Sequence, residues 1–230
     1  RKLKQAEGRG KENTKYYTIM ISGRYHKDYW IVVDVIGSAS FQELDQFLRD
    51  IWLECCGHLS CFHIGGHTLE YTTKCFLELY GDDEDLNDMK HSLDEMLSEG
   101  VTFGHVYDYG TSTELLLEVK EVRSGKKRKD KIVVESRNAF KKPGCSFCGK
   151  EAKWVIPDGF EYYIRKPYMC EDCYKAAMED LDSDIALQIN ELEFYDLDYA
   201  SPICNSPRMG VCGYEGSRKY PEDFVPDQKA

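Results

Sequence analysis

Two Cys-x-x-Cys pairs constrain the fold of this chain more than any other feature of its sequence. Cys145 and Cys148 form the first pair, and Cys170 and Cys173 form the second. Each pair can chelate one metal ion through a tight turn, and four thiolates suit tetrahedral zinc. Four protein ligands leave no open position for water or substrate, so the pattern predicts a structural Zn²⁺ site. The equal spacing of the pairs argues against the alternatives, a redox dithiol or unrelated cysteines.

The 21 residues between the pairs, 149–169, are just enough for a β-hairpin. Its predicted strands are 153–156 and 161–165, joined at the turn signal Pro157-Asp158-Gly159. A predicted helix over 171–178 follows the second pair. A knuckle, a hairpin and a second pair in the first turn of a helix is the arrangement of a treble-clef zinc finger.

The residues before the pairs alternate between strand and helix signals. Ser40-Phe41-Gln42-Glu43 is a capping box that opens a helix ending near Gly57. Its steps of three and four predict a buried face; the residues on that face are Phe41, Leu44, Leu48, Ile51 and Cys55. Predicted strands are 16–22, 29–35, 61–64, 68–71, 101–109, 114–123 and 131–135, with a short helix over 92–97. The third and fourth strands flank a Gly65-Gly66 turn, and 82–88 is an acidic loop.

This pattern predicts an α+β fold, with a mixed or antiparallel sheet packed with helices and a small C-terminal zinc domain. We expect four parts: a charged arm at 1–15, the α+β domain at 16–142, the zinc finger with an acidic helix at 143–200, and an extended tail at 201–230. The tail contains four prolines, at 202, 207, 221 and 226, and its apolar content suggests that it folds back on one of the domains.

Three stretches of the α+β domain carry a family resemblance: the helix 41–52, the segment 57–66 with its His58-Leu59 and Ile64-Gly65, and 103–110 with Tyr107-Asp108-Tyr109-Gly110. Together they resemble the plasmid pRiA4b ORF-3-like domain over about residues 16–134. That family typically continues its last motif with Asp-x-Trp, where this chain has Thr111-Ser112-Thr113. The resemblance implies a fold and a link to mobile DNA through passenger proteins of insertion elements. It implies no reaction.

The net charge of −11 is strongly segregated along the chain. Residues 78–99 carry nine acids and one lysine, and 171–198 carry ten acids and one lysine, whereas 120–142 carries ten basic residues and three acids. Such a chain can present a basic strip to phosphates in weak, salt-dependent contacts; its tip contains Lys126, Lys127, Arg128 and Lys129. The alternative is a solvated hairpin tip. The acidic helix suits a basic protein surface, so we expect a protein partner.

Other cysteines and histidines offer weaker metal patterns. His58, Cys61, His63 and His67 lie within ten residues. On a strand, however, Cys61 and His63 face away from Phe62 and Ile64, and we expect the latter face to be core. Cys55, Cys56 and Cys75 are predicted to be buried small hydrophobes. Cys204 and Cys212 lack a Cys-x-x-Cys partner, so a site there would need ligands from elsewhere.

Asp108 is the strongest candidate for chemistry outside the pairs. With His58 or His105 and a metal it could serve a hydrolase or nuclease, or its carboxylate could accept hydrogen bonds from the turn at 110–113. The sequence contains no Gly-rich phosphate loop, Ser elbow or His-Glu-x-x-His pattern. No apolar run reaches the ~20 residues that span a bilayer. We therefore favour a non-enzymatic, zinc-binding interaction module in a reducing cytoplasm.

Overall fold

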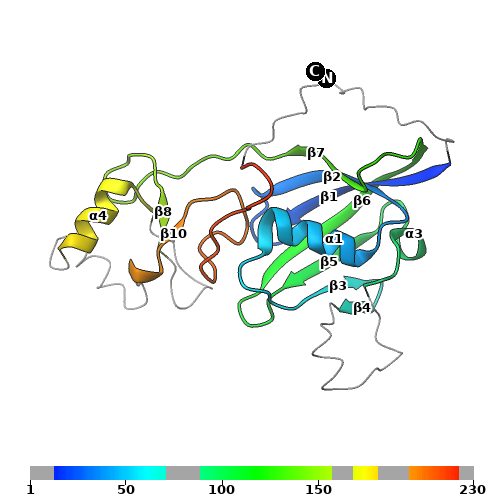
Figure 1. Cartoon of the computed structure of the whole chain (residues 1–230), viewed down its shortest axis with the longest axis horizontal. Coiled ribbons are helices and arrows are strands. Elements are labelled where there is room, and N and C mark those ends of the chain that lie inside the picture. The colour runs from blue at the N-terminus through cyan, green and yellow to red at the C-terminus, as the bar shows by residue number, and fades with distance from the viewer. Residues whose placement is uncertain (1–12, 71–88, 157–167, 181–196, 223–230) are drawn as a thin grey trace. The chain divides into compact units, whose positions relative to one another are not determined.

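The computed structural model describes residues 13–70, 89–156, 168–180 and 197–222 (Figure 1). These residues fall into two compact units, each described by itself below. The first unit contains residues 13–49, 58–70 and 89–138. The second contains residues 50–57, 139–156, 168–180 and 197–222. The second unit is therefore built from segments far apart in the sequence.

A seven-stranded sheet forms the first unit, in the order β4-β3-β5-β6-β1-β2-β7. All of its strand pairs are antiparallel, which confirms the expected α+β class and selects an antiparallel sheet over a mixed one. The strands are β1 (Thr14–Gly23), β2 (Trp30–Ile36), β3 (Ser60–Ile64), β4 (His67–Glu70), β5 (Thr102–Tyr107), β6 (Thr113–Gly125) and β7 (Ile132–Arg137).

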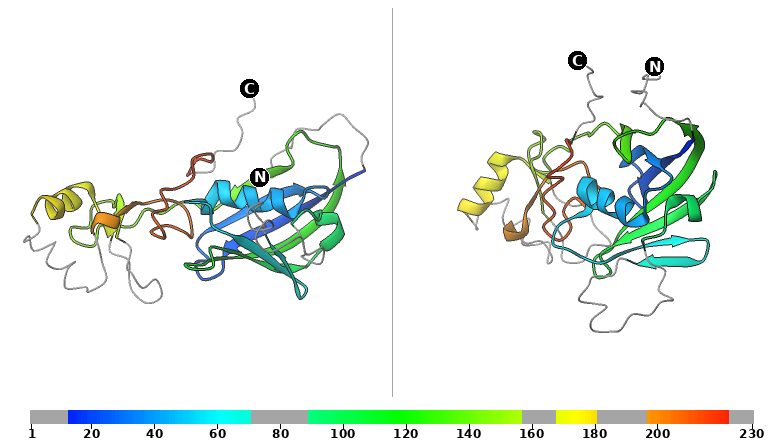
Figure 2. Two further views of the ribbon diagram at one scale, coloured as in Figure 1. Left: turned by 60° about the horizontal axis from the view of Figure 1, so that its bottom comes forward. Right: turned by 45° about the vertical axis from the view of Figure 1, so that its right-hand side comes forward.

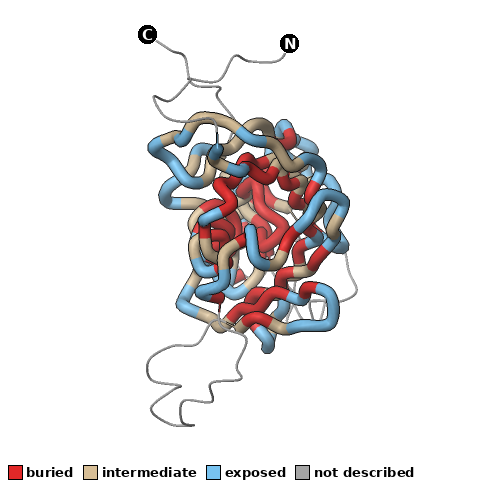
Figure 3. The backbone as a smooth tube through the Cα atoms, turned by 90° about the vertical axis from the view of Figure 1, so that its right-hand side faces the viewer, coloured by how far each residue is buried: buried red, intermediate tan, exposed pale blue. Residues whose placement is uncertain are grey.

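Side-chain alternation on the long central strands sets the core. On β1, Tyr17, Ile19 and Ile21 are fully buried, while Thr18 and Met20 between them are half-buried. Successive strand residues point to opposite faces, so these three apolar side chains share the covered face of the sheet. Figure 3 shows the buried segments of the backbone in red and the exposed ones in pale blue.

The capping box at Ser40 forms as predicted. The Ser40 hydroxyl accepts the amide of Glu43 at 3.2 Å, and the Glu43 carboxylate accepts the amide of Ser40 at 3.0 Å. These bonds open α1 (Phe41–Leu48), which lies across one face of the sheet (Figure 2). Phe41 packs against Phe62 of β3 and Phe103 of β5, with ring centroids 5.2 and 6.2 Å away. This aromatic cluster fixes the helix on the sheet.

The end of α1 differs from the prediction. After Leu48 the chain widens into a π-helical turn, η1 (Arg49–Leu53). Ile51 on this turn is buried, but Cys55 lies beyond it and is half-exposed. The predicted continuation of the buried helix face to Cys55, and of the helix to Gly57, is therefore wrong. A π turn adds residues per turn, so it shifts every later side chain off the 3.6-residue period.

The remaining connections of the first unit follow local signals. Gly65 and Gly66 join β3 to β4 with φ of +55° and +89°, conformations that favour glycine. The short helix α3 (Leu93–Met96) begins after Ser92, as predicted. The predicted acidic loop at 82–88 lies outside the described residues.

The second unit has a three-stranded sheet and a helix. β8 (Trp154–Val155) pairs with β9 (Tyr168–Met169) on one side and with β10 (Ser201–Pro202) on the other. A helix, α4 (Glu171–Glu179), follows β9, and a 3-10 turn, η2 (Leu197–Tyr199), precedes β10. The predicted helix over 171–178 is thus present. The predicted strand at 161–165 and its turn at 157–159 lie outside the described residues.

Residues 201–222 are part of this second unit and consist mainly of turns. Ser201 and Pro202 form the edge strand next to β8. Among the described residues, no helix combines the length and the apolar character needed to cross a membrane.

Candidate metal centres

Cys145, Cys148, Cys170 and Cys173 come together in the second unit. Their sulfur atoms all lie within 4.8 Å of one another, and the Cys148 and Cys170 sulfurs are 3.5 Å apart. This group is geometrically able to hold a metal ion. Cys145 and Cys170 are buried, whereas Cys148 is exposed.

Two short local structures position these sulfurs. The first pair sits on a tight turn, closed by the Gly149 amide donating to the Cys145 carbonyl at 2.9 Å. Gly149 has a φ of +75°, a backbone conformation that is unfavourable for any residue with a side chain. Cys170 is the N-cap of α4, where its sulfur accepts the amide of Cys173 at 3.5 Å. The turn and the helix start therefore present two sulfurs each to the same point.

The electrostatics of this group favour a bound cation. Burial alone raises the pKa of Cys145, but backbone amides of Cys170, Phe147 and Cys148 outweigh it and lower that pKa to about 6. Burial and the neighbouring sulfurs raise the pKa of Cys173 well above its usual range. The Cys145 thiol thus ionises readily, while the neighbouring sulfurs oppose ionisation of the Cys173 thiol. A cation among the sulfurs removes that opposition.

The core around these cysteines is small. It contains Ile156, Met169, Ala177 and Leu197 beside the buried cysteines. Trp154 stacks on Tyr174 with ring centroids 4.9 Å apart, and the Trp154 indole donates to Glu171 at 3.1 Å. A core of this size supplies little stability without an additional cross-link.

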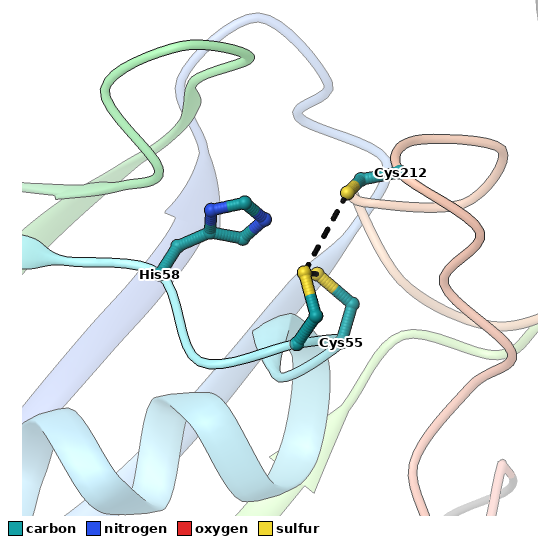
Figure 4. Close-up of side chains that lie close together, drawn as sticks. Cys55, His58 and Cys212 are labelled. Carbon is teal, nitrogen blue, oxygen red and sulfur yellow. Dashed lines mark hydrogen bonds between the residues drawn. The ribbon is translucent and has the colours of Figure 1, made fainter.

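A second group of thiols, which sequence reasoning missed, also belongs to the second unit. Cys55, Cys56 and Cys212 place their sulfurs 3.7 Å apart between the first two and 3.8 Å apart between Cys56 and Cys212. The Cys55 and Cys212 side chains point toward one another in Figure 4. Cys55 is half-exposed and Cys56 is exposed, so the prediction that they are buried hydrophobes is wrong. Cys75 lies outside the described residues.

The sequence predicts that a site at Cys212 would need ligands from elsewhere, and the two thiols near it come from a distant segment. No sequence motif links residues separated by 156 positions. The sequence signals that pointed to this group were the Cys55-Cys56 dipeptide near a predicted helix end and the Cys212-Gly213 dipeptide. Cys204, in contrast, is buried in an apolar cluster with Val155, Met209 and Tyr214.

The histidine-rich hairpin of the first unit does not form a metal group. Phe62 and Ile64 are buried and His63 is exposed, as the predicted strand faces require. Cys61 is also buried, and its sulfur lies 3.4 Å from His63 Nε2. Within the part of the chain that the structure describes, Cys61, His63 and His67 join no cluster of three or more metal-ligating side chains.

The Asp108 side chain stabilises the turn that follows it by accepting hydrogen bonds from its backbone amides. Its Oδ1 accepts the amides of Gly110 and Thr111 at 3.0 and 3.2 Å, and its φ of +67° is rare for a residue with a side chain. His58 Nε2 lies 3.4 Å from the other carboxylate oxygen. His105, the second partner considered for Asp108, is bound to Asp45 instead.

His105 belongs to a buried polar network that the sequence did not reveal. Its Nε2 lies 2.7 Å from Asp45 Oδ1, and Asp45 also accepts from Arg49 at 2.6 Å and from Ser60 at 2.7 Å. All four residues are buried. Burial raises the pKa of Asp45, but His105, Arg49 and Ser60 outweigh it and hold that pKa below its usual value of 3.8. The network joins α1 to β3 and β5 from within the core.

The basic tip between β6 and β7 is not uniform. Lys127 and Lys129 are exposed, whereas Arg128 is half-buried. The Arg128 guanidinium lies 2.8 Å from Asp34 and 4.4 Å from the ring centroid of Tyr16. One of the four predicted phosphate-binding residues is therefore engaged in the fold.

Comparison with known proteins does not assign the chain to a family. No family model and no curated protein matches the chain. The crystal structure of a protein of unknown function, MM3350 from Methanosarcina mazei Go1, is similar at a TM-score of 0.45 and 11% identity. That similarity covers 78% of this chain and 92% of the other.

Proposed function

We propose that this chain is a non-enzymatic interaction module with a structural zinc ion on Cys145, Cys148, Cys170 and Cys173. The convergence of these four sulfurs within 4.8 Å supports the proposal most directly. Sulfurs in a tetrahedron around zinc, with bonds of about 2.3 Å, are about 3.8 Å apart. The separation of 3.5 Å between Cys148 and Cys170 is close to that spacing. Four thiolates suit zinc and complete its coordination, so this ion would stabilise the fold without performing a reaction.

The helix that carries the second cysteine pair supports a protein partner. Asp172, Glu179 and Asp180 of this region are exposed, and Met178 beside them is 40% exposed. An acidic surface with an apolar side chain suits a basic protein surface and repels the phosphates of nucleic acid. We therefore propose a partner that offers clustered lysine or arginine.

The alternative, a metal-dependent hydrolase or nuclease using Asp108 with His58 or His105, has less support. One oxygen of Asp108 is occupied by the turn that it caps, and His105 is fully buried against Asp45. The proximity of His58 to Asp108 is the observation in its favour. The resemblance to the plasmid pRiA4b ORF-3-like domain and its link to mobile DNA stay a prediction. A cytoplasmic location belongs to the same proposal, because thiolates persist as metal ligands in a reducing compartment.

Metal analysis and peptide binding together test this function. We expect purified protein to contain zinc, and Cys145→Ser to reduce that content. Fluorescence anisotropy with a lysine-rich peptide should show salt-sensitive binding, and an acidic peptide of equal length should not bind. Glu179→Lys should weaken the binding several-fold. Asp28→Lys, an equal charge change at an exposed site in the first unit, should not. A zinc-free protein, or equal effects of the two charge changes, would overturn the proposal.

A further inference from the structure

The three thiols of Cys55, Cys56 and Cys212 have the spacing of metal ligands. Their measured separations of 3.7 and 3.8 Å match the distance of about 3.8 Å between sulfurs that share a tetrahedral zinc ion. Cys56 and Cys212 are exposed, so this approach does not result from burial of thiols in an apolar core. Thiols at an exposed position have no apolar reason to gather, and a shared ligand supplies one.

Packing within the second unit holds the two segments of this cluster together. The Ser206 hydroxyl donates to the Trp52 carbonyl at 2.7 Å, and the Ser217 hydroxyl donates to the Asp50 carbonyl at 2.6 Å. Cys55 also packs against the apolar cluster that contains Cys204 and Met209. These bonds lie on both sides of Cys212 in the sequence, so the approach of its thiol is built into the fold.

The backbone at Cys212 is strained in a way that presents its side chain. Its φ of +50° is uncommon for any residue other than glycine, and it lies between Gly210 and Gly213, with φ of +74° and +64°. The Tyr214 amide closes this turn by donating to the Val211 carbonyl at 2.9 Å. Such backbone conformations at non-glycine residues cluster at functional sites.

A buried cation stands beside the cluster. The Arg208 side chain is fully buried, and its guanidinium donates to the Cys55 sulfur at 3.5 Å. This contact helps to hold the Cys55 sulfur in place within the second unit.

We propose that Cys55, Cys56 and Cys212 form a second zinc site. The three thiolates would fill three of the four positions of a tetrahedral zinc ion. It would cross-link two segments separated by 156 positions, and closing a loop of that length restricts the unfolded chain strongly.

Zinc counting in single variants of the full chain tests this second site independently of the first. Native mass spectrometry of protein purified under reducing conditions should show two zinc ions per chain. Cys212→Ser should retain one, because the four cysteines of the first site are unchanged. Cys204→Ala is the matched control, since it alters a cysteine of the same segment and should retain two. Thermal unfolding of each variant separates loss of a ligand from loss of the fold.

Cobalt substitution tests the ligand set. Fully loaded protein should bind two Co²⁺, and Cys212→Ser should lose about half of the thiolate-to-cobalt charge-transfer absorbance. One zinc per chain in the wild type, or an unchanged count in a folded Cys212→Ser protein, would overturn the second site. A disulfide among the three thiols in the reduced preparation would overturn it as well.

Discussion

The guanidinium of Arg128 lies 2.8 Å from the carboxylate of Asp34, whose side chain is 1% exposed. Asp34 comes from β2, and Arg128 comes from the loop between β6 and β7, so the pair attaches this loop to the sheet. Arg123 of β6 is a second cation on the same carboxylate. Arg128, which the sequence predicts to bind phosphates, therefore pairs with the buried carboxylate of Asp34 in its own chain.

Arg128→Ala should destabilise the first unit by about 1.5–3 kcal/mol, the range for a lost hydrogen bond to a charged group. We expect no larger loss of stability, because Arg123 still pairs with the Asp34 carboxylate in this variant. Urea unfolding measures it. Lys127→Ala, at the exposed neighbouring residue, should change stability by less than about 0.5 kcal/mol. Equal effects of the two substitutions would show that the Arg128 pair contributes nothing.

Leu48→Ala should cost about 2–5 kcal/mol, because it leaves a cavity between α1 and the sheet. Leu48 is fully buried in the first unit, on the helix face that the sequence predicts. Gln42→Ala on the exposed face of the same helix is the control. Chemical unfolding of both variants gives the comparison, and a loss below about 1 kcal/mol for Leu48→Ala would contradict this placement.

Several elements of the fold are specified by local sequence signals. The capping box at Ser40, the Gly65-Gly66 turn and the alternation on β1 act between near neighbours, so the sequence is sufficient to predict them. The gathering of the two Cys-x-x-Cys pairs follows likewise from two local turns. The π-helical turn after Leu48 was not predictable from periodicity, because it breaks the period itself. The pairs His105–Asp45 and Cys56–Cys212 join residues 60 and 156 positions apart, and no local pattern encodes such pairs.

Acid should weaken the first unit through Asp45. The folded pKa of Asp45 is below 3.8, because the bonds from His105, Arg49 and Ser60 outweigh its burial. Its charge therefore stabilises the fold above about pH 4, and this contribution is lost as the pH falls through the folded pKa. Asp45→Asn should flatten the fall in stability between about pH 5 and pH 2. Urea unfolding followed by sheet amide signals in NMR measures this, with Asp28→Asn as an exposed control. An unchanged slope in Asp45→Asn would contradict the prediction.

Removal of metal should loosen the second unit and spare the first. The second unit has only small apolar clusters around its cysteines, whereas the sheet of the first unit has an extensive core. Zinc binding energy is folding energy where the core is small. Hydrogen exchange with and without a chelator should show faster exchange at Tyr168–Met169 and in α4, and little change in β1 and β6. Uniform loosening of both units would contradict this difference.

Nucleic acid should bind weakly and with strong salt dependence, through the lysines of the tip. Because Arg128 is engaged by Asp34, the phosphate contacts of the tip would come from Lys126, Lys127 and Lys129, and such contacts carry no base information. About three such contacts predict a loss of affinity of about 40-fold between about 50 and 200 mM salt.

A triple lysine-to-alanine variant that keeps Arg128 should abolish this binding without unfolding the first unit. Lys27→Ala, at an exposed residue in the loop between β1 and β2, should leave it unchanged. Fluorescence anisotropy with labelled duplexes of two unrelated sequences measures both effects. Tight binding that prefers one duplex at physiological salt would contradict the prediction, because phosphate contacts alone cannot distinguish sequences.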